Sequence, residues 1–93
     1  MHAISLNTPF ERNPDLIWTD MDGETVMMSI ERGEYLGLGG AGSRIWELLA
    51  EPVTPAEICA RVTAEFEVDP DTCTADVVSF LGELLENDVI RQQ

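Results

Sequence analysis

The stretch YLGLGGAGSRIW, Tyr35 to Trp46, contains the point where the periodicity of this chain changes from strand to helix. Tyr35 to Leu38 is typical of a short strand. From Ala41 onward the apolar residues, beginning with Ile45, recur at helical spacing. The glycines between the two patterns allow a tight passage from one to the other. We therefore expect a strand-to-helix junction here.

The same glycines also match G-x-G-x-x-G, the pattern of a dinucleotide-binding loop, over residues 37–42. That loop requires a second parallel strand with an acidic residue about 20 positions further on. The acid at that distance is Glu57, which begins a helix, and no second parallel strand follows. A phosphate loop needs a Lys, and the chain contains none. The pattern is interpreted as coincidental, and no nucleotide is expected.

Three short strands are predicted before the junction, as an antiparallel meander. Leu16 to Thr19 is β-branched and aromatic, and a turn follows it. Over Glu24 to Ile30, successive side chains alternate between two faces with period two, which predicts a strand. A second turn, Glu31 to Glu34, leads to the strand that begins at Tyr35. Residues 1–15 lack periodicity and are expected to be an irregular lead-in.

Three helices are predicted after the junction. The first ends before Pro52, and the second begins at the capping box Thr54-Pro55-Ala56-Glu57. The third covers about residues 70–87, with Asp69 as its cap, and its apolar side chains span an arc of about 160° on a helical wheel. The fold class expected is α+β and winged-helix-like: a three-stranded antiparallel sheet followed by three helices.

The charge of the chain restricts its partners. It has 18 Asp and Glu against 5 Lys and Arg, a formal net charge of -13. Nucleic acid and anionic membranes attract proteins through Lys and Arg, so neither is expected as a partner. A basic or neutral peptide, or a protein with a basic patch, suits this charge better. Without a signal-peptide or membrane-spanning pattern, the expected location is the cytoplasm.

The residues that usually carry catalysis or bind metal are few. His2 is the only histidine, and Cys59 and Cys73 form no C-x-x-C pattern, so they are interpreted as buried thiols. No nucleophile has a credible base beside it. We expect no catalytic residues, no metal site and no cofactor, and therefore not an enzyme.

The order and spacing of several segments resemble the PqqD-like family, the RiPP recognition elements that bind leader peptides of ribosomally made, modified peptides. The segments that carry the resemblance are Gly33 to Leu38, Arg44 to Leu49, Val53 to Ile58, Val68-Asp69, Asp76 to Leu81 and Val89-Ile90. The recognition domain would cover residues 16–91. Within the family, the chain looks most like the stand-alone leader-binding protein of lasso-peptide biosynthesis. It departs from the family in having Gly39 where an Asn often follows the third strand, which leaves the cap of the first helix undetermined.

The resemblance implies that a leader adds as a strand to the edge of the third strand and packs against the third helix. The leader-binding residues expected on this basis are Glu34, Tyr35, Leu36, Gly37, Asp76, Val77, Phe80, Glu83 and Leu84. Val77, Phe80 and Leu84 would line the groove, while Leu81 and Leu85 would face the core. The acids Asp76 and Glu83 would pair with a basic or hydroxyl group of the leader.

The function expected is a non-catalytic adaptor that delivers a precursor peptide to a processing enzyme, namely a leader-cleaving cysteine peptidase of a lasso pathway. An alternative is a PqqD-type chaperone that presents its peptide to a radical SAM enzyme, and a weaker one is a winged-helix regulator. We expect either a monomer or a weak homodimer, because an open strand edge can pair with the edge of a second copy.

Overall fold

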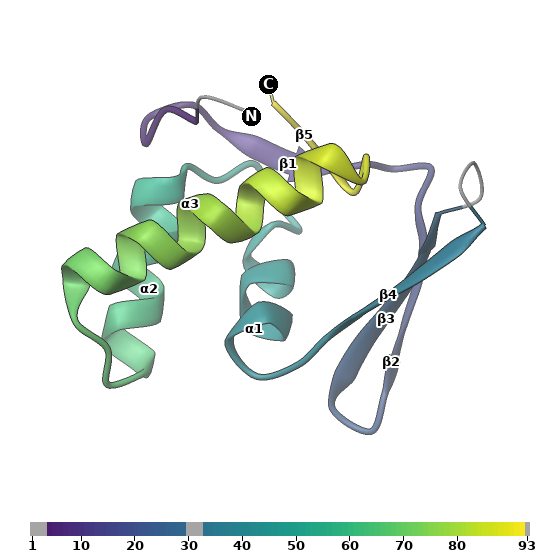
Figure 1. Ribbon diagram of the computed structural model, residues 1–93, viewed down its shortest axis with the longest axis horizontal. Helices are drawn as coiled ribbons and strands as arrows, with labels where there is room; N and C mark the ends of the chain where they lie inside the picture. The colour runs from purple at the N-terminus through teal and green to yellow at the C-terminus, as the bar shows by residue number, and fades with distance from the viewer. Residues whose placement is uncertain (1–3, 30–32, 93) are drawn as a thin grey trace.

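The computed structural model describes residues 4–29 and 33–92 (Figure 1). The elements in chain order are β1 (Phe10–Arg12), β2 (Ile17–Met21), β3 (Glu24–Ser29), β4 (Glu34–Leu38), α1 (Ala41–Leu48), α2 (Pro55–Glu65), α3 (Pro70–Glu86) and β5 (Ile90–Gln92). The expected α+β class, with a three-stranded antiparallel sheet followed by three helices, is confirmed.

The three-stranded sheet has the order β2-β3-β4, with both pairs antiparallel. The first strand runs from Ile17 to Met21, so the turn after it is shorter than expected. Asp22 and Gly23 form this turn with positive φ angles of 53° and 85°, which suit a tight hairpin. Ile30, Glu31 and Arg32, at the second turn, lie outside the described residues.

The lead-in expected to be irregular over residues 1–15 contains a strand, so that prediction is wrong for Phe10–Arg12. β1 pairs with β5 at the other end of the chain, and Phe10 also forms a bridge with Val53. Phe10 is fully buried. Three residues are too few to show a period, and their partners are remote in sequence, so local patterns could not reveal this strand.

The helices begin where their capping residues predict. The Thr54 hydroxyl accepts a hydrogen bond from the Glu57 amide at 3.2 Å, and the Asp69 carboxylate accepts one from the Thr72 amide at 3.1 Å. The N-cap of α1 is Gly40, with φ 56° and no side-chain cap, which answers the question raised by Gly39. Without Cβ, Gly40 adopts this backbone conformation at little cost.

The core lies where the helices meet each other and one face of the sheet. α1 lies between α2 and the sheet, and α3 runs across both of the other helices (Figure 1). Trp46 of α1, Ile58 of α2, Leu81 of α3 and Met27 of β3 are each at most 1% exposed. Because Thr25 and Met27 are the buried residues of β3, the sheet face that carries them is the inner one.

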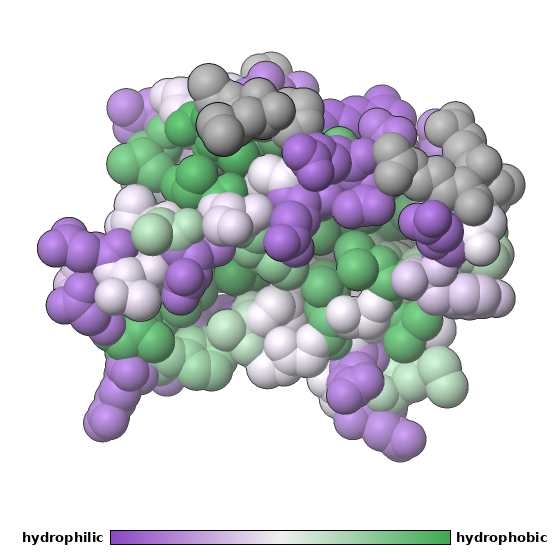
Figure 2. All heavy atoms as spheres, in the orientation of Figure 1, coloured by the Kyte–Doolittle hydropathy of each residue, from purple (hydrophilic) through white to green (hydrophobic). Residues whose placement is uncertain are grey.

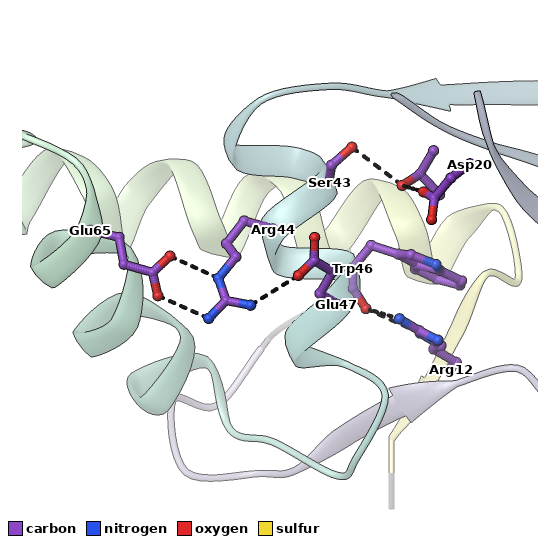
Figure 3. Close-up of polar contacts among 8 residues, drawn as sticks. Arg12, Asp20, Ser43, Arg44, Trp46, Glu47 and Glu65 are labelled. Carbon is purple, nitrogen blue, oxygen red and sulfur yellow. Dashed lines mark hydrogen bonds and ion pairs between the residues drawn. The ribbon is translucent and has the colours of Figure 1, made fainter. Parts of the chain in front are cut away.

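Two arginines fix α1 against its neighbours (Figure 3). The Arg12 guanidinium lies 4.7 Å from the ring centre of Trp18 and 4.4 Å from that of Trp46, and it donates hydrogen bonds to the Trp46 carbonyl. Burial lowers the pKa of Arg12. Arg44 of α1 pairs with Glu65 of α2 through two contacts, of 2.8 and 3.0 Å. The position of α1 is therefore fixed on both sides.

Candidate functional site: the groove between β4 and α3

β4 forms one edge of the three-stranded sheet. Its residues pair with β3, and in the described part of the chain no strand pairs with its other edge. Each residue of an antiparallel strand directs its amide and carbonyl to one side or the other in alternation. Part of the β4 backbone therefore presents unpaired donors and acceptors at this edge, which is suited to accept another extended chain.

A groove of about 410 Å³ adjoins this edge. Its walls come from the end of β4 and from all three helices. The lining residues are Gly37, Leu38, Gly39, Ala41, Gly42, Ile45, Val62, Val68, Cys73, Asp76, Val77 and Phe80. Most are apolar, and Asp76 is the one charged residue among them. Figure 2 shows hydrophobic residues at the surface between α3 and the sheet, with hydrophilic residues around them.

Gly42 and Phe80 meet at the wall of the groove. A Cβ atom at position 42 would lie 3.5 Å from Cζ of Phe80 and 3.7 Å from Cβ of Leu38. These are ordinary contact distances, so a methyl group there would occupy space beside the Phe80 ring without forcing it away. The junction itself is held by the Ser43 hydroxyl, which donates to the Leu38 carbonyl at 2.8 Å.

The Cys73 side chain forms an uncharged part of the groove wall. This side chain is buried, and burial raises the pKa of its thiol, with smaller contributions in the same direction from Cys59 and Asp76. A raised pKa keeps the thiol protonated at neutral pH. The sulfur therefore acts here as an apolar surface rather than as a nucleophile.

A second, smaller hollow of about 70 Å³ lies beside the start of β4. Its lining residues are Leu16, Met27, Glu34, Tyr35, Leu36, Asn87 and Val89. The first half of β4 thus contributes to this hollow and its last residues to the main groove. An extended peptide of five residues, about 17 Å long, would match the length of β4 and contact both.

The nine residues expected to bind a leader fall into three groups. Gly37, Asp76, Val77 and Phe80 line the main groove. Glu34, Tyr35 and Leu36 line the smaller hollow. Neither lining includes Glu83 or Leu84.

Leu84 is 1% exposed and packs in the core, which corrects its expected place on the groove wall. Glu83 is exposed, and its backbone carbonyl accepts a hydrogen bond from the Asn87 side chain at the end of α3. Leu81 is fully buried, as expected, and Leu85 packs against the core.

Several groove residues were not predicted, and they come from elements that flank β4 and α3. The expected binding residues did not include Ile45, Val62 or Val68, which all line the groove. One signal was available: Cys73 lies between Phe80 and Val77 on the helical wheel of α3, so it belongs to the same wall. The contributions of α1 and α2 depend on tertiary packing.

The described residues contain neither a group of side chains suited to a metal ion nor a helix able to span a membrane. Among residues 4–29 and 33–92, no three His, Cys, Asp or Glu side chains are grouped so that they could hold a metal ion. His2 lies outside this range. Across the same described ranges, no helix has the length and apolar character needed to cross a membrane.

Comparison with known proteins gives one family and two similar structures. The family model of coenzyme PQQ synthesis protein D (PqqD) matches residues 24–90. One similar structure is TbiB1 in complex with the TbiA(beta) leader peptide, whose sequence is 33% identical to this chain. The superposition covers 87% of this chain and 94% of the TbiB1 chain, with a TM-score of 0.80. A lasso peptide synthetase B1 complexed with its leader peptide is 24% identical, covers 88% and 96%, and has a TM-score of 0.78, which supports the fold. No curated protein matches the chain.

Proposed function

The chain belongs to the PqqD family, and on this basis we propose that it binds the leader segment of a ribosomally made precursor peptide and delivers it to a processing enzyme. The proposal gives the chain no catalytic role. Its place of action would be the cytoplasm, where such a precursor is synthesised. The observation that carries the proposal is the open edge of β4 beside an apolar groove.

Strand addition explains why the edge and the groove occur together. Hydrogen bonds between the leader backbone and β4 would supply affinity and register without depending on the leader sequence. Side chains on one face of the added strand would then enter the groove and select the leader. TbiB1, the structure that is 33% identical to this chain, was solved with a leader peptide bound, which supports this reading.

The chemistry of the groove favours large apolar leader side chains. Each such side chain that is fully buried contributes about 1.5–3 kcal/mol. Two or three of them, together with strand pairing, are sufficient for micromolar or tighter binding after the cost of ordering the peptide. Asp76 lines the groove and would accept a hydrogen bond from a basic or hydroxyl group of the leader.

A charge substituted into the groove wall tests the proposal. Phe80→Asp places a carboxylate where an apolar leader side chain would pack, whereas Ser79→Asp adds the same charge at the exposed neighbouring position on α3. We expect Phe80→Asp to raise the Kd for a fluorescently labelled leader peptide by about tenfold or more, because burying an unpaired charge is costly. Ser79→Asp should stay within about twofold of the wild type, since its carboxylate remains hydrated.

Fluorescence anisotropy measures both affinities, and circular dichroism checks that both variants are folded. Equal affinities of the two folded variants for the leader would exclude the groove as the binding site. Failure of the wild type to bind any leader of the pathway would refute the function itself.

The enzyme that receives the peptide is proposed to be a leader-cleaving cysteine peptidase of a lasso pathway. The similarity to TbiB1 and to a lasso peptide synthetase B1 supports this choice. The alternative, a chaperone that presents a precursor to a radical SAM enzyme, is supported by the match to the PqqD family model. Affinity measurements with each purified enzyme distinguish them. The weaker alternative, a winged-helix regulator, is disfavoured because α3 carries Asp71, Asp76, Glu83 and Glu86 and no basic residue.

A further inference from the structure

The face of the three-stranded sheet that points away from α1 carries exposed apolar side chains. Successive residues of a strand point to opposite faces, and Met27 marks the inner face because it is buried. Ile17, Met28 and Tyr35 pair across the three strands with the opposite parity. They therefore form one row across the outer face.

Further apolar residues extend this row along the sheet. Val26 pairs with Thr19 and Gly37, and Met21 pairs with Glu24, again on the outer face. The exposed fractions are 53% for Ile17, 59% for Met21 and 74% for Tyr35. We call the set Ile17, Met21, Val26, Met28 and Tyr35 the outer sheet face. Contiguous apolar area of this kind is typical of a protein interaction surface.

The charged residues at the β2–β3 end of the outer sheet face are acidic. Asp22 and Glu24 lie at the β2–β3 turn, with the Glu24 side chain extending toward Gly39. The arginines among the described residues lie elsewhere: Arg12 contacts the two tryptophans, Arg44 pairs with Glu65, Arg91 pairs with Asp15, and Arg61 is on α2. The surface thus combines an apolar centre with two acids at one end, Asp22 and Glu24, which we call its acidic rim.

This combination determines which occupant fits. A second copy of the chain would bring another acidic rim, and a further charge of -13, against the first. Like charges brought together at an interface disfavour the complex. A partner with an apolar patch surrounded by Lys or Arg would instead meet opposite charges, which also accelerates association.

We propose that the outer sheet face docks the enzyme that processes the leader, through an apolar patch on that enzyme with a basic rim. The proposal rests on the proposed function. A leader added at β4 lies in the plane of the sheet and leaves the outer sheet face uncovered. An enzyme seated on that face would lie directly beside the bound peptide, because β4 belongs to both surfaces.

Removal of the apolar side chains tests this surface. The triple variant Ile17→Thr, Met21→Thr, Met28→Thr removes three apolar side chains of this face, none of which lines the groove or the smaller hollow, and Thr retains a high preference for strands. The matched control, Leu6→Thr with Phe66→Thr, removes exposed apolar side chains outside the sheet. Biolayer interferometry measures the Kd for the purified leader-cleaving peptidase, and fluorescence anisotropy measures the Kd for a synthetic leader. A second variant, Asp22→Asn with Glu24→Lys, reverses the net charge of the rim.

We expect the triple variant to bind the peptidase about tenfold or more weakly, with leader affinity within about twofold of wild type, while the control changes neither. The rim variant should slow association with the peptidase and reduce its dependence on salt. If the triple variant and the rim variant both bind the peptidase with the same Kd as the wild type, the proposal is overturned. A wild-type dimer that the triple variant converts to a monomer in sedimentation would also overturn it, because the face would then hold a second copy. If the wild type fails to bind the leader, the proposed function is refuted instead. Failure of the docking surface and failure of the proposed function therefore give different results.

Discussion

Arg12 joins the short strand β1 to both tryptophans of the chain. Its guanidinium lies over the rings of both Trp18 on β2 and Trp46 on α1. The two rings contact each other edge to face, with their centres 5.7 Å apart. The hydrogen bonds of Arg12 to the Trp46 carbonyl fix the guanidinium in this position. One residue therefore connects β1, β2 and α1, and it supports the element that forms one wall of the groove.

Substitution of Arg12 should destabilise the fold more than substitution of an exposed arginine. Arg12→Met keeps an unbranched side chain but loses two cation–π contacts and the hydrogen bonds to Trp46. We expect the free energy of unfolding to fall by about 1–3 kcal/mol. Urea denaturation followed by tryptophan fluorescence measures it, with Arg61→Met, exposed on α2, as the control. Equal free energies of unfolding for the two variants would show that the contacts of Arg12 with the tryptophans do not stabilise the fold.

Individual groove residues were predictable only in part. The family resemblance, combined with the angles on the helical wheel, predicted Phe80, Val77 and Asp76 on this wall, and all three line the groove. The same angles could not show that Leu84 is covered by the core, because a broad apolar arc does not reveal where one neighbour ends and another begins. Gly42 was interpreted as a flexible passage, yet it also lies against Phe80.

Among the elements, α1 and α2 are held together by charge as well as by packing. Hydrogen bonds from Arg44 lower the pKa of Glu65, so the folded state favours the carboxylate form. A carboxyl group whose pKa is lowered on folding stabilises the protein above its ordinary pKa, here 4.5, and this contribution is lost as the pH falls through the lowered value.

The stability difference between the wild type and Glu65→Gln should therefore depend on pH. We expect it to be largest near neutral pH and to shrink as the pH falls below 4.5, once the wild-type carboxyl group is protonated. Thermal unfolding over a pH series measures the difference, with Glu67→Gln in the following loop as the control. A difference that is constant over the whole series would contradict a role for the ionised pair.

The elements with strong local signals were predicted well, and those with remote partners were not. Thr54 and Asp69 place the starts of α2 and α3 because a cap and a following proline are encoded within a few residues. β1 was missed because its pairing with β5 depends on the whole intervening chain. The groove has the same limitation, since α1 and α2 contribute walls that no single element predicts.

In the molecule as a whole, the two proposed surfaces use different parts of one sheet. The edge of β4 and the groove would hold the leader, and the outer sheet face would hold the enzyme. The rest of the surface is strongly acidic, which disfavours nucleic acid and suits a basic partner. If both proposals hold, the leader and the enzyme would be bound at once, as an adaptor requires.

Hydrogen exchange of the backbone amides, measured by NMR with and without a leader peptide, tests strand addition most directly. If the leader adds to β4, the amides of Glu34–Leu38 that point away from β3 should exchange at least about tenfold more slowly in the complex. The amides of the opposite edge strand, Ile17–Met21, should be unaffected. Binding that leaves the β4 amides unchanged, or that protects β2 instead, would contradict leader recognition at this edge.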